Sequence, residues 1–432
     1  MHISAPALPF PKRPERAGKM RWKIVWVLFF STVTNYISRQ SFSVLSPMIT
    51  SQYHLTHSEL ARILGAFQIA YAVTWLIGGV ILDAVGCRMG LALAAIWWST
   101  MNILTGFASS VAGFASCRFL LGLGEGFNWP GASKVVAEWF PSEERSLAVA
   151  IFDSGSSVGG ALAALAIPLI ALAFGLRFAF AAAGLLGFVW VAVWLRTYYP
   201  LKQHPRVSDA EIALIKVGQQ PTLPTERGAA RWTRLARNPA LWGIVIGRSL
   251  TDPIWWFYVF WLPQYLSDAR GFSLKQISMF AWMPFVAADI GNFSGGWISG
   301  VCIRHGISAT SARKIVCAVS CVPILAGIPA AAMHNAYFAL ALICIALWGF
   351  ASWSTMGLTL PSDLFPPEVV GSVTGLSGLA AGLVGVAFTL LVGVIVDKFS
   401  YRPAFLAAGL LPIVATAFLY ILVRNPRDVV SL

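Results

Sequence analysis

Long apolar runs, separated by short polar segments, cover almost the whole of this 432-residue sequence. Each run is long enough to cross about 30 Å of hydrocarbon as a helix. Lipid offers the backbone no hydrogen-bond partners, so the runs predict helices rather than open strands. We therefore expect an all-α membrane protein with twelve transmembrane helices, at residues 22–47, 59–82, 90–109, 112–137, 146–174, 178–198, 240–266, 275–301, 314–333, 336–361, 371–396 and 403–423.

A polar, proline-containing stretch divides these spans six and six, and two sequence patterns recur across it. Glu138–Glu143 returns as Asp363–Glu368, and Gly78–Ile81 returns as Gly295–Ile298. Parallel six-helix repeats of this kind predict two pseudo-symmetric bundles. The expected organisation is a tail (1–21), a first bundle (22–198), a central loop (199–238), a second bundle (239–424) and a short tail (425–432).

The distribution of charge predicts the orientation. Only 11% of the residues are charged, against about 25% in soluble domains. Most of the 31 Lys and Arg residues fall in the tails, the central loop and the connections on one side, whereas Arg118 counts among the few at the opposite helix mouths. By the positive-inside rule both termini are cytoplasmic. The net charge of +13 is spread over loops, which argues against nucleic-acid binding.

The sequence contains no motif for a cofactor or a metal. Its six cysteines form no CxxC pair, and neither HExxH nor a P-loop occurs. We therefore expect no metal site, no cofactor and no intrinsic ATPase.

Arg39 is the strongest functional candidate, because it lies about 25 Å along the first predicted helix, near the bilayer centre. A charge there costs at least about 2.5–3.5 kcal/mol unless it faces a polar cavity and finds a partner. Tyr36 and Ser43 share its helical face. A guanidinium binds carboxylates through two hydrogen bonds, so Arg39 predicts an anion site. The alternative is a structural ion pair with Glu125.

Two sets of motifs carry a family resemblance. Gly79-x3-Asp83-x2-Gly86-x-Arg88, with Arg118 and Gly122, resembles the signatures of the major facilitator superfamily. The resemblance implies that Gly79, Asp83, Gly86 and Arg88 gate the rocking of two halves. The second-half counterpart, Gly296–Gly300, lacks the aspartate, so any latch there should be weaker.

The second set narrows the resemblance. Asn35-Tyr36-x-x-Arg39, Gly124–Gly126, Leu250–Tyr258 and Ser362–Pro366 resemble the anion:cation symporters, especially bacterial hexuronate and sugar-acid importers. The resemblance implies import of a small organic anion together with a proton, by alternating access. We expect a monomer.

Three acidic residues are candidates for proton coupling. Glu125 lies near mid-membrane, where burial favours protonation and Arg39 opposes it. Relatives often carry an acidic residue where this chain has Ser38, which cannot titrate. Asp153 could supply that group or could be a carboxylate bonded to nearby serines. Asp289, three residues before Asn292, could titrate or cap a polar cluster.

The remaining candidates would bind the substrate hydroxyls and ring. Ser352–Thr355 interrupts an apolar run, and Arg248 and Asp252 are spaced to pair with each other. Of the four aromatic residues Trp255, Trp256, Tyr258 and Trp261, we expect two to be packing. The predicted substrate-binding set is Arg39, Tyr36, Tyr71, Asn128, Trp256, Tyr258, Trp353, Ser354 and Thr355.

The predicted function is a proton-coupled importer of a hexuronate such as glucuronate or galacturonate. An aldonate, an aldarate or a phthalate-like acid is the alternative substrate, with or without proton coupling. A polytopic membrane enzyme should show an acidic loop motif for metal and phosphate, and none is seen. A nutrient sensor should carry a long cytoplasmic output domain, for which the loop and tails leave no room.

Overall fold

A computed structural model describes residues 18–217, 235–365 and 367–423. The final tail 425–432, most of the first tail and part of the central loop lie outside the described residues. The first half contains α1 (Met20–Tyr53), α2 (His57–Val85), α3 (Cys87–Thr105), α4 (Val111–Glu125), α5 (Asn128–Trp139), α6 (Ser142–Phe174) and α7 (Leu176–Thr197). The second half contains α10 (Pro239–Asp268), α11 (Leu274–Phe280), α12 (Met283–Arg304), α13 (Ala309–Ile324), α14 (Gly327–Ala330), α15 (Ala336–Leu364), α16 (Pro367–Lys398) and α17 (Arg402–Leu422).

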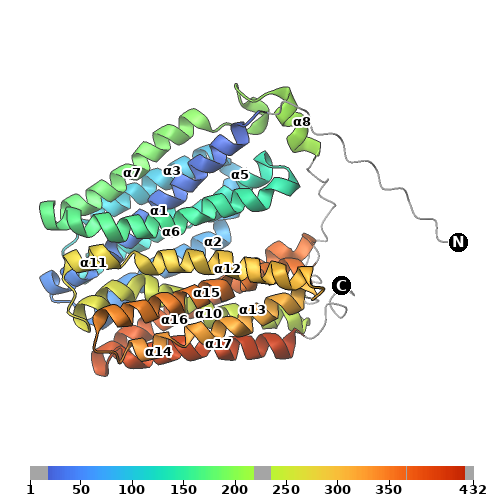
Figure 1. Cartoon of the computed structure of the whole chain (residues 1–432). Coiled ribbons are helices and arrows are strands. Elements are labelled where there is room, and N and C mark those ends of the chain that lie inside the picture. Colours follow the sequence, from blue (N-terminus) through green and yellow to red (C-terminus); the bar gives the residue numbers. More distant parts are fainter. Residues whose placement is uncertain (1–17, 218–234, 366, 424–432) are drawn as a thin grey trace.

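The two halves use the same helix pairings. In the first half α1 packs on α6, α2 on α4, and α3 on α7. In the second half α10 packs on α16, α12 on α15, and α13 on α17. Figure 1 shows the two bundles as separate layers. The all-α fold with two pseudo-symmetric bundles is thus confirmed.

Three predicted spans consist of two helices each. The span at 112–137 breaks at Gly126 and Phe127 between α4 and α5, and Pro130 follows in the first turn of α5. The span at 275–301 breaks before Pro284, the second residue of α12. The span at 314–333 breaks shortly after Pro323, between α13 and α14. Proline removes a backbone donor and is tolerated in the first turn of a helix, which suits Pro130 and Pro284 just after a break.

Six described helices are each long and apolar enough to cross a membrane: α6, α7, α15, α16, α17 and the combined α13–α14 segment. The bent pair His57–Trp75 and Ile77–Val85 would make a seventh. Other predicted spans contain buried polar groups, such as Arg39 in α1 and Arg248 in α10. These polar groups lower the mean hydropathy of the helices that carry them. Such groups face the protein interior rather than lipid.

The described part of the central loop is ordered on the first half. It forms a 3-10 turn (Leu201–Gln203) and α8 (Asp209–Val217), neither of which the sequence predicted. Glu211 is 1% exposed and accepts hydrogen bonds from the backbone of Met20 and Arg21, at 3.2 and 3.1 Å. The Arg21 side chain also binds Glu211 at 3.0 Å and Glu144 at 2.7 Å. This cluster fixes α8 to the start of α1.

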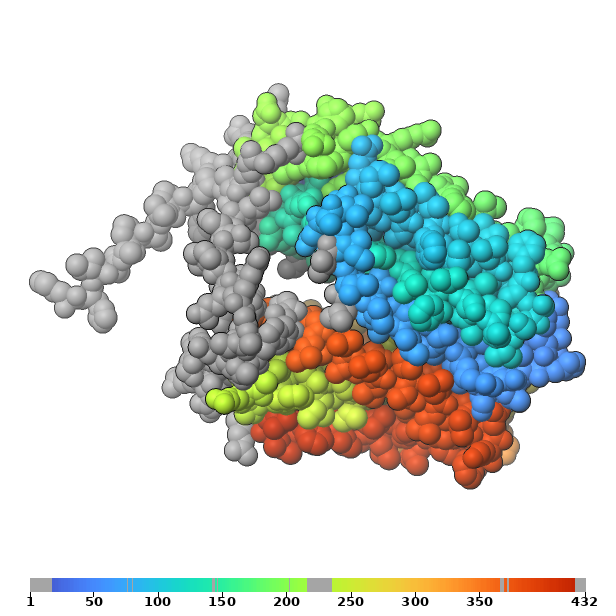
Figure 2. Space-filling view, turned by 180° about the vertical axis from the view of Figure 1, so that it is seen from behind, coloured from blue at the N-terminus to red at the C-terminus, as the bar shows by residue number. Residues whose placement is uncertain are grey.

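The two halves meet at the end opposite α8. There the His57 imidazole lies 2.9 Å from Asp397 and 2.8 Å from Asp268, both in the second half. Gln264 donates to Thr50 at 3.2 Å, and a Cβ on Gly393 would lie 2.7 Å from the His57 carbonyl oxygen. Figure 2 shows the halves touching at this end and standing apart towards α8.

Candidate functional site

A cavity of about 800 Å³ lies between the halves. Helices of both bundles line it, because α1, α2 and α6 face α10, α12, α15 and α16 across the interface. The polar and aromatic side chains in its wall are Tyr36, Arg39, Gln68, Tyr71, Trp75, Trp129, Asp153, Ser154, Ser156 and Ser157 from the first half, and Arg248, Asp252, Trp255, Trp256, Asp289, Asn292, Phe293, Phe350, Ser354, Thr355 and Thr359 from the second.

Arg39 is the central cation of the first-half wall. Its Nε donates to Glu125 Oε2 at 2.9 Å, and its Nη2 donates to Asn35 Oδ1 at 3.1 Å. The guanidinium carbon lies 4.4 and 4.5 Å from the ring centres of Tyr36 and Tyr71. Cation–π contacts stabilise a desolvated guanidinium. Arg39 belongs to the cavity wall although its side chain is only 1% exposed.

Close packing of α2 on α4 positions Glu125 against Arg39. A Cβ on Gly122 would lie 2.5 Å from the Phe67 carbonyl oxygen, and one on Gly126 would lie 2.6 Å from Thr74 Cβ. Only glycine permits such an approach of two helices. Glu125 ends α4 and is fully buried, and its Oε1 has no hydrogen-bond partner among the described residues.

Arg118 corrects the sequence prediction that placed it at an outer helix mouth. It is 1% exposed in α4, and its Nη1 donates to the Arg39 carbonyl oxygen at 3.2 Å. The guanidinium carbon lies 4.4 Å from the Phe67 ring centre. Arg118 thus supports the helix that carries Arg39 but is absent from the cavity wall.

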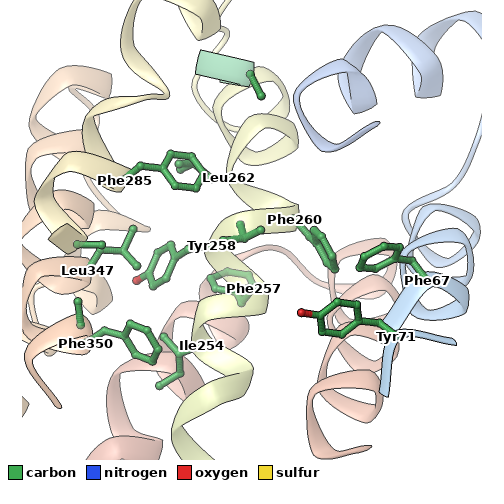
Figure 3. Close-up of a cluster of buried hydrophobic side chains, with 14 of the residues drawn as sticks. Phe67, Tyr71, Ile254, Phe257, Tyr258, Phe260, Leu262, Phe285, Leu347 and Phe350 are labelled. Carbon is green, nitrogen blue, oxygen red and sulfur yellow. The ribbon is translucent and has the colours of Figure 1, made fainter. Parts of the chain in front are cut away.

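Aromatic side chains join the two halves beside Arg39. The Tyr71 and Trp256 rings meet edge to face at 6.1 Å, and Phe67 meets Phe260 at 6.2 Å. Figure 3 shows Phe67 and Tyr71 on one side of α10 and Tyr258 on the other. The cavity therefore has an aromatic boundary towards its closed end.

Two acidic residues face the cavity from opposite halves. Asp153 lies on α6, and Ser157, one turn later, donates to Asp289 Oδ1 on α12 at 2.6 Å. This hydrogen bond crosses the interface between the halves.

A separate charged pair lies on α10 in the second half, where Arg248 binds Asp252 at 2.8 Å and Ser377 at 3.1 Å. The Arg248–Asp252 pair matches the spacing predicted from the sequence.

A family model described as Major Facilitator Superfamily matches residues 28–389. The chain belongs to the major facilitator superfamily. Its helix pairings and its cavity between two bundles are those of this facilitator fold. The family and the named relatives are transporters rather than enzymes.

Curated relatives of this facilitator carry sugar acids. A hexuronate transporter of Escherichia coli (strain K12) is 30% identical over 413 residues, covering 94% of each chain. A galacturonate transporter of Dickeya chrysanthemi is 32% identical over 300 residues, covering 69% of this chain and 87% of the relative. A solved bacterial homologue of the human lysosomal transporter Spinster, in an inward-facing and occupied conformation, superposes with a TM-score of 0.75 at 16% identity, covering 95% of this chain and 98% of the other. This last likeness supports the fold alone.

Three predicted substrate contacts of this facilitator lie outside the cavity wall. Asn128 is 1% exposed and bonds Ser31 and Thr32 of α1 at 2.6 and 3.2 Å. Trp353 is fully buried and donates to Thr416 at 2.9 Å. Tyr258 points into an apolar hollow with Phe285 and Leu347. Each has a packing role that its position in the sequence does not distinguish from a cavity role.

The signature loop of this facilitator is anchored within the first half. Asp83 binds Lys134 of α5 at 2.6 Å, and Arg88 donates to the Leu195 carbonyl oxygen at 2.8 Å. Gly86 has φ +82 and forms the turn between α2 and α3, whereas Gly79 has open space at its Cβ position. In the second half, where the motif lacks its aspartate, Arg313 binds Asp363 at 3.1 Å and Ser299 at 2.7 Å. An ion pair between α13 and α15 thus lies beside this second-half motif.

Gln68, Trp75 and Trp129 are among the members of the wall that sequence reasoning missed. Gln68 is 4% exposed in the middle of an apolar run. An amide at that depth is itself a signal, since a buried polar side chain requires a partner.

Proposed function

We propose that this chain imports a hexuronate together with a proton, by alternating access. The observation that carries the proposal is Arg39, a buried guanidinium at the cavity wall whose only carboxylate partner among the described residues is Glu125. The sugar-acid transporters among its relatives support the substrate class.

In the proposed cycle the substrate carboxylate competes with Glu125 for Arg39. Glu125, once displaced in a buried environment, takes a proton. The substrate carboxylate then neutralises Arg39, and the protonated Glu125 carries no charge. In this state the halves rock about the cavity and carry the substrate and the proton across the membrane. Tyr36, Tyr71, Trp256, Ser354 and Thr355 contact the sugar, and Asp153 and Asp289 assist proton transfer.

The open end of the cavity is the cytoplasmic one in this proposal, as the excess of basic residues on the α8 side supports. The structure then corresponds to an inward-open state of a monomer in a bacterial inner membrane. The domain limits 22–198 and 239–424 follow the same scheme, with Gly79, Asp83, Gly86 and Arg88 gating the inner ends.

Uptake of radiolabelled glucuronate into proteoliposomes, with and without an inward proton gradient, tests the proposal. Gluconate, tartrate and phthalate serve as competitors. Gradient-dependent accumulation is the expected result. Glucuronate uptake that does not depend on the gradient would contradict proton coupling. Transport of another acid but not of glucuronate would contradict the proposed substrate.

A further inference from the structure

Gln68 presents a buried amide to the cavity without a protein partner. The side chain is 4% exposed, and neither its Nε2 nor its Oε1 is hydrogen-bonded to any described residue. The indole Nε1 of Trp75, seven residues later on α2, likewise has no partner among them. Both residues line the cavity. A buried amide left without partners destabilises a protein, so its position at a binding cavity calls for a ligand that satisfies it.

The α2 face that carries these groups starts beside Arg39. Residues 68, 71 and 75 share one face of a helix, because they are three and four positions apart. The Tyr71 ring lies 4.5 Å from the Arg39 guanidinium carbon and 6.4 Å from the Trp75 ring. A molecule whose carboxylate binds Arg39 therefore extends along a wall with an amide and an indole N–H.

The chemistry of these groups matches hydroxyls. An amide offers a donor and an acceptor side by side, and a hydroxyl is both as well. The indole supplies a donor for a hydroxyl or ring oxygen, and its ring provides an apolar face for C–H groups. A carboxylic acid without hydroxyls would leave both amide atoms unsatisfied, which is how a polar site rejects an apolar analogue.

We infer that Gln68 and Trp75 form a hydroxyl-recognition subsite that selects polyhydroxy acids over acids of the same charge and ring size without hydroxyls. This inference rests on the proposed function, because the carboxylate must first be held at Arg39. In this inference the carboxylate bound at Arg39 holds the ligand in place, and the side chains of α2 determine which acids bind.

Gln40 provides a matched control within the same chain. It too is fully buried, and both of its amide atoms lack partners among the described residues. However, Gln40 is not part of the cavity wall. An effect on ligand selectivity should follow Gln68 and not Gln40, whereas a purely structural role would affect both through stability.

The experiment measures binding of glucuronate and cyclohexanecarboxylate to the purified full chain by calorimetry. Both acids carry one carboxylate on a six-membered ring, but only glucuronate carries hydroxyls. The ratio of their dissociation constants should fall at least about tenfold in Gln68→Met, consistent with loss of hydrogen bonds to the ligand. It should stay at the wild-type value in Gln40→Met. The melting temperature of Gln68→Met should equal or exceed that of wild type, because an unsatisfied amide has been removed.

The outcomes separate the inference from the proposed function. Wild type that binds neither acid would overturn both. Wild type that prefers glucuronate, with the same ratio in Gln68→Met, would overturn the inference alone. If Gln68→Met does not fold, Trp75→Phe removes the indole N–H and keeps an aromatic ring, although a smaller one, at that position. An unchanged ratio in that variant would then overturn the inference, and a reduced ratio would support it.

Discussion

At the scale of single residues, the proposed cycle requires the guanidinium of Arg39 to exchange one carboxylate for another. It holds Glu125 at 2.9 Å inside a cage of aromatic rings. The pair is neutral as a whole, which lowers the cost of burial, and removal of either partner leaves an uncompensated charge.

Arg39→Ala should abolish uptake at every pH, with a loss of about 100-fold or more, because truncating one partner of a buried charge pair typically costs 2–5 kcal/mol. Initial uptake of labelled glucuronate into proteoliposomes measures it. Arg62→Ala is the control, since the Arg62 side chain is 63% exposed and should keep wild-type uptake. Appreciable uptake by Arg39→Ala would show that the anion binds elsewhere.

Glu125→Gln should retain exchange of substrate across the membrane but lose accumulation against a gradient. Oε1 of Glu125 is unpartnered among the described residues, so it can take the proton when the substrate carboxylate replaces Oε2 at Arg39. Glutamine resembles this protonated form and cannot release the proton. Counterflow and accumulation assays on the same vesicles separate the two effects, and concentrative uptake by the variant would rule out a coupling role.

Asp153→Asn tests whether a second acidic residue takes over from the position held by Ser38. Asp153 lies on the cavity wall, one turn before the serine that bonds Asp289. If it carries a proton, the variant should accumulate several-fold less substrate while binding it normally. Accumulation to the wild-type level would assign Asp153 a structural role.

Sequence reasoning at this scale found the charged centre more easily than the rest of the wall. Arg39 and Glu125 are conspicuous because charges are costly in a membrane. Tyr258 and Trp353 lie outside the cavity wall. α10 and α15 are apolar on nearly every face, so periodicity does not reveal which face meets the cavity. Gln68 was missed although its buried amide carried the same kind of signal as Arg39.

At the scale of helices, the N-terminal end of α2 carries the contacts that join the two halves opposite α8. His57 lies just before the predicted span 59–82, with Asp268 of α10 and Asp397 of α16 against its two ring nitrogens. Tyr401 and Gln264 also bond Asp268, Ser58 bonds Asp397, and Glu59 caps α2 nearby. Since both nitrogens face carboxylates, the doubly protonated ring satisfies the cluster best.

Opening at this end should depend on pH through His57. The hydrogen bond to Asp268, opposed by burial and helped by the bond to Asp397, raises the pKa of His57. The closed form therefore has its full stabilisation below the ordinary histidine pKa of about 6.5, and loses it as pH rises through the raised value. The labelling rate of a cysteine introduced at Thr50, expressed here and below relative to a free thiol at the same pH because only the thiolate reacts, should increase over that pH range in the parent.

His57→Gln is the matching variant, because glutamine hydrogen-bonds but does not titrate. Labelling should then be faster at low pH than in the parent and nearly independent of pH. A parent that labels at the same rate from pH 5 to 9 would contradict the role of His57.

Helix breaks were the hardest elements to predict. The runs at 112–137, 275–301 and 314–333 look continuous in hydropathy, but each is divided near a proline or glycine. The hydrophobic pattern reports the length of a crossing and not the continuity of its hydrogen bonds. The short helix α8 was also absent from the prediction, since its stability comes from Glu211 contacting α1 rather than from its own sequence.

At the scale of the whole molecule, transport by rocking requires the outer contacts to separate in each cycle. Thr50 on α1 and Gln264 on α10 touch across the halves at 3.2 Å. A cleavable thiol cross-linker between cysteines at these two positions should reduce uptake at least about tenfold if the opening is needed for entry. Reductive cleavage should restore it, and each single-cysteine variant is the control. Full uptake in the cross-linked protein would refute rocking about this interface.

The contact at Gly393 lies near one end of α16, so a rotation about it moves the other end of that helix much further than its middle. There α16 and α2 approach so closely that a side chain on Gly393 would collide with the His57 backbone. From Gly393 to its first residue, Pro367, α16 runs about 39 Å, so a rotation of about 10° around this contact displaces that far end by about 7 Å. Halfway along this length the displacement is only about 3 Å. A motion that moves the substrate's binding groups by little more than one hydrogen-bond length thus moves the distant mouth by the width of a sugar ring.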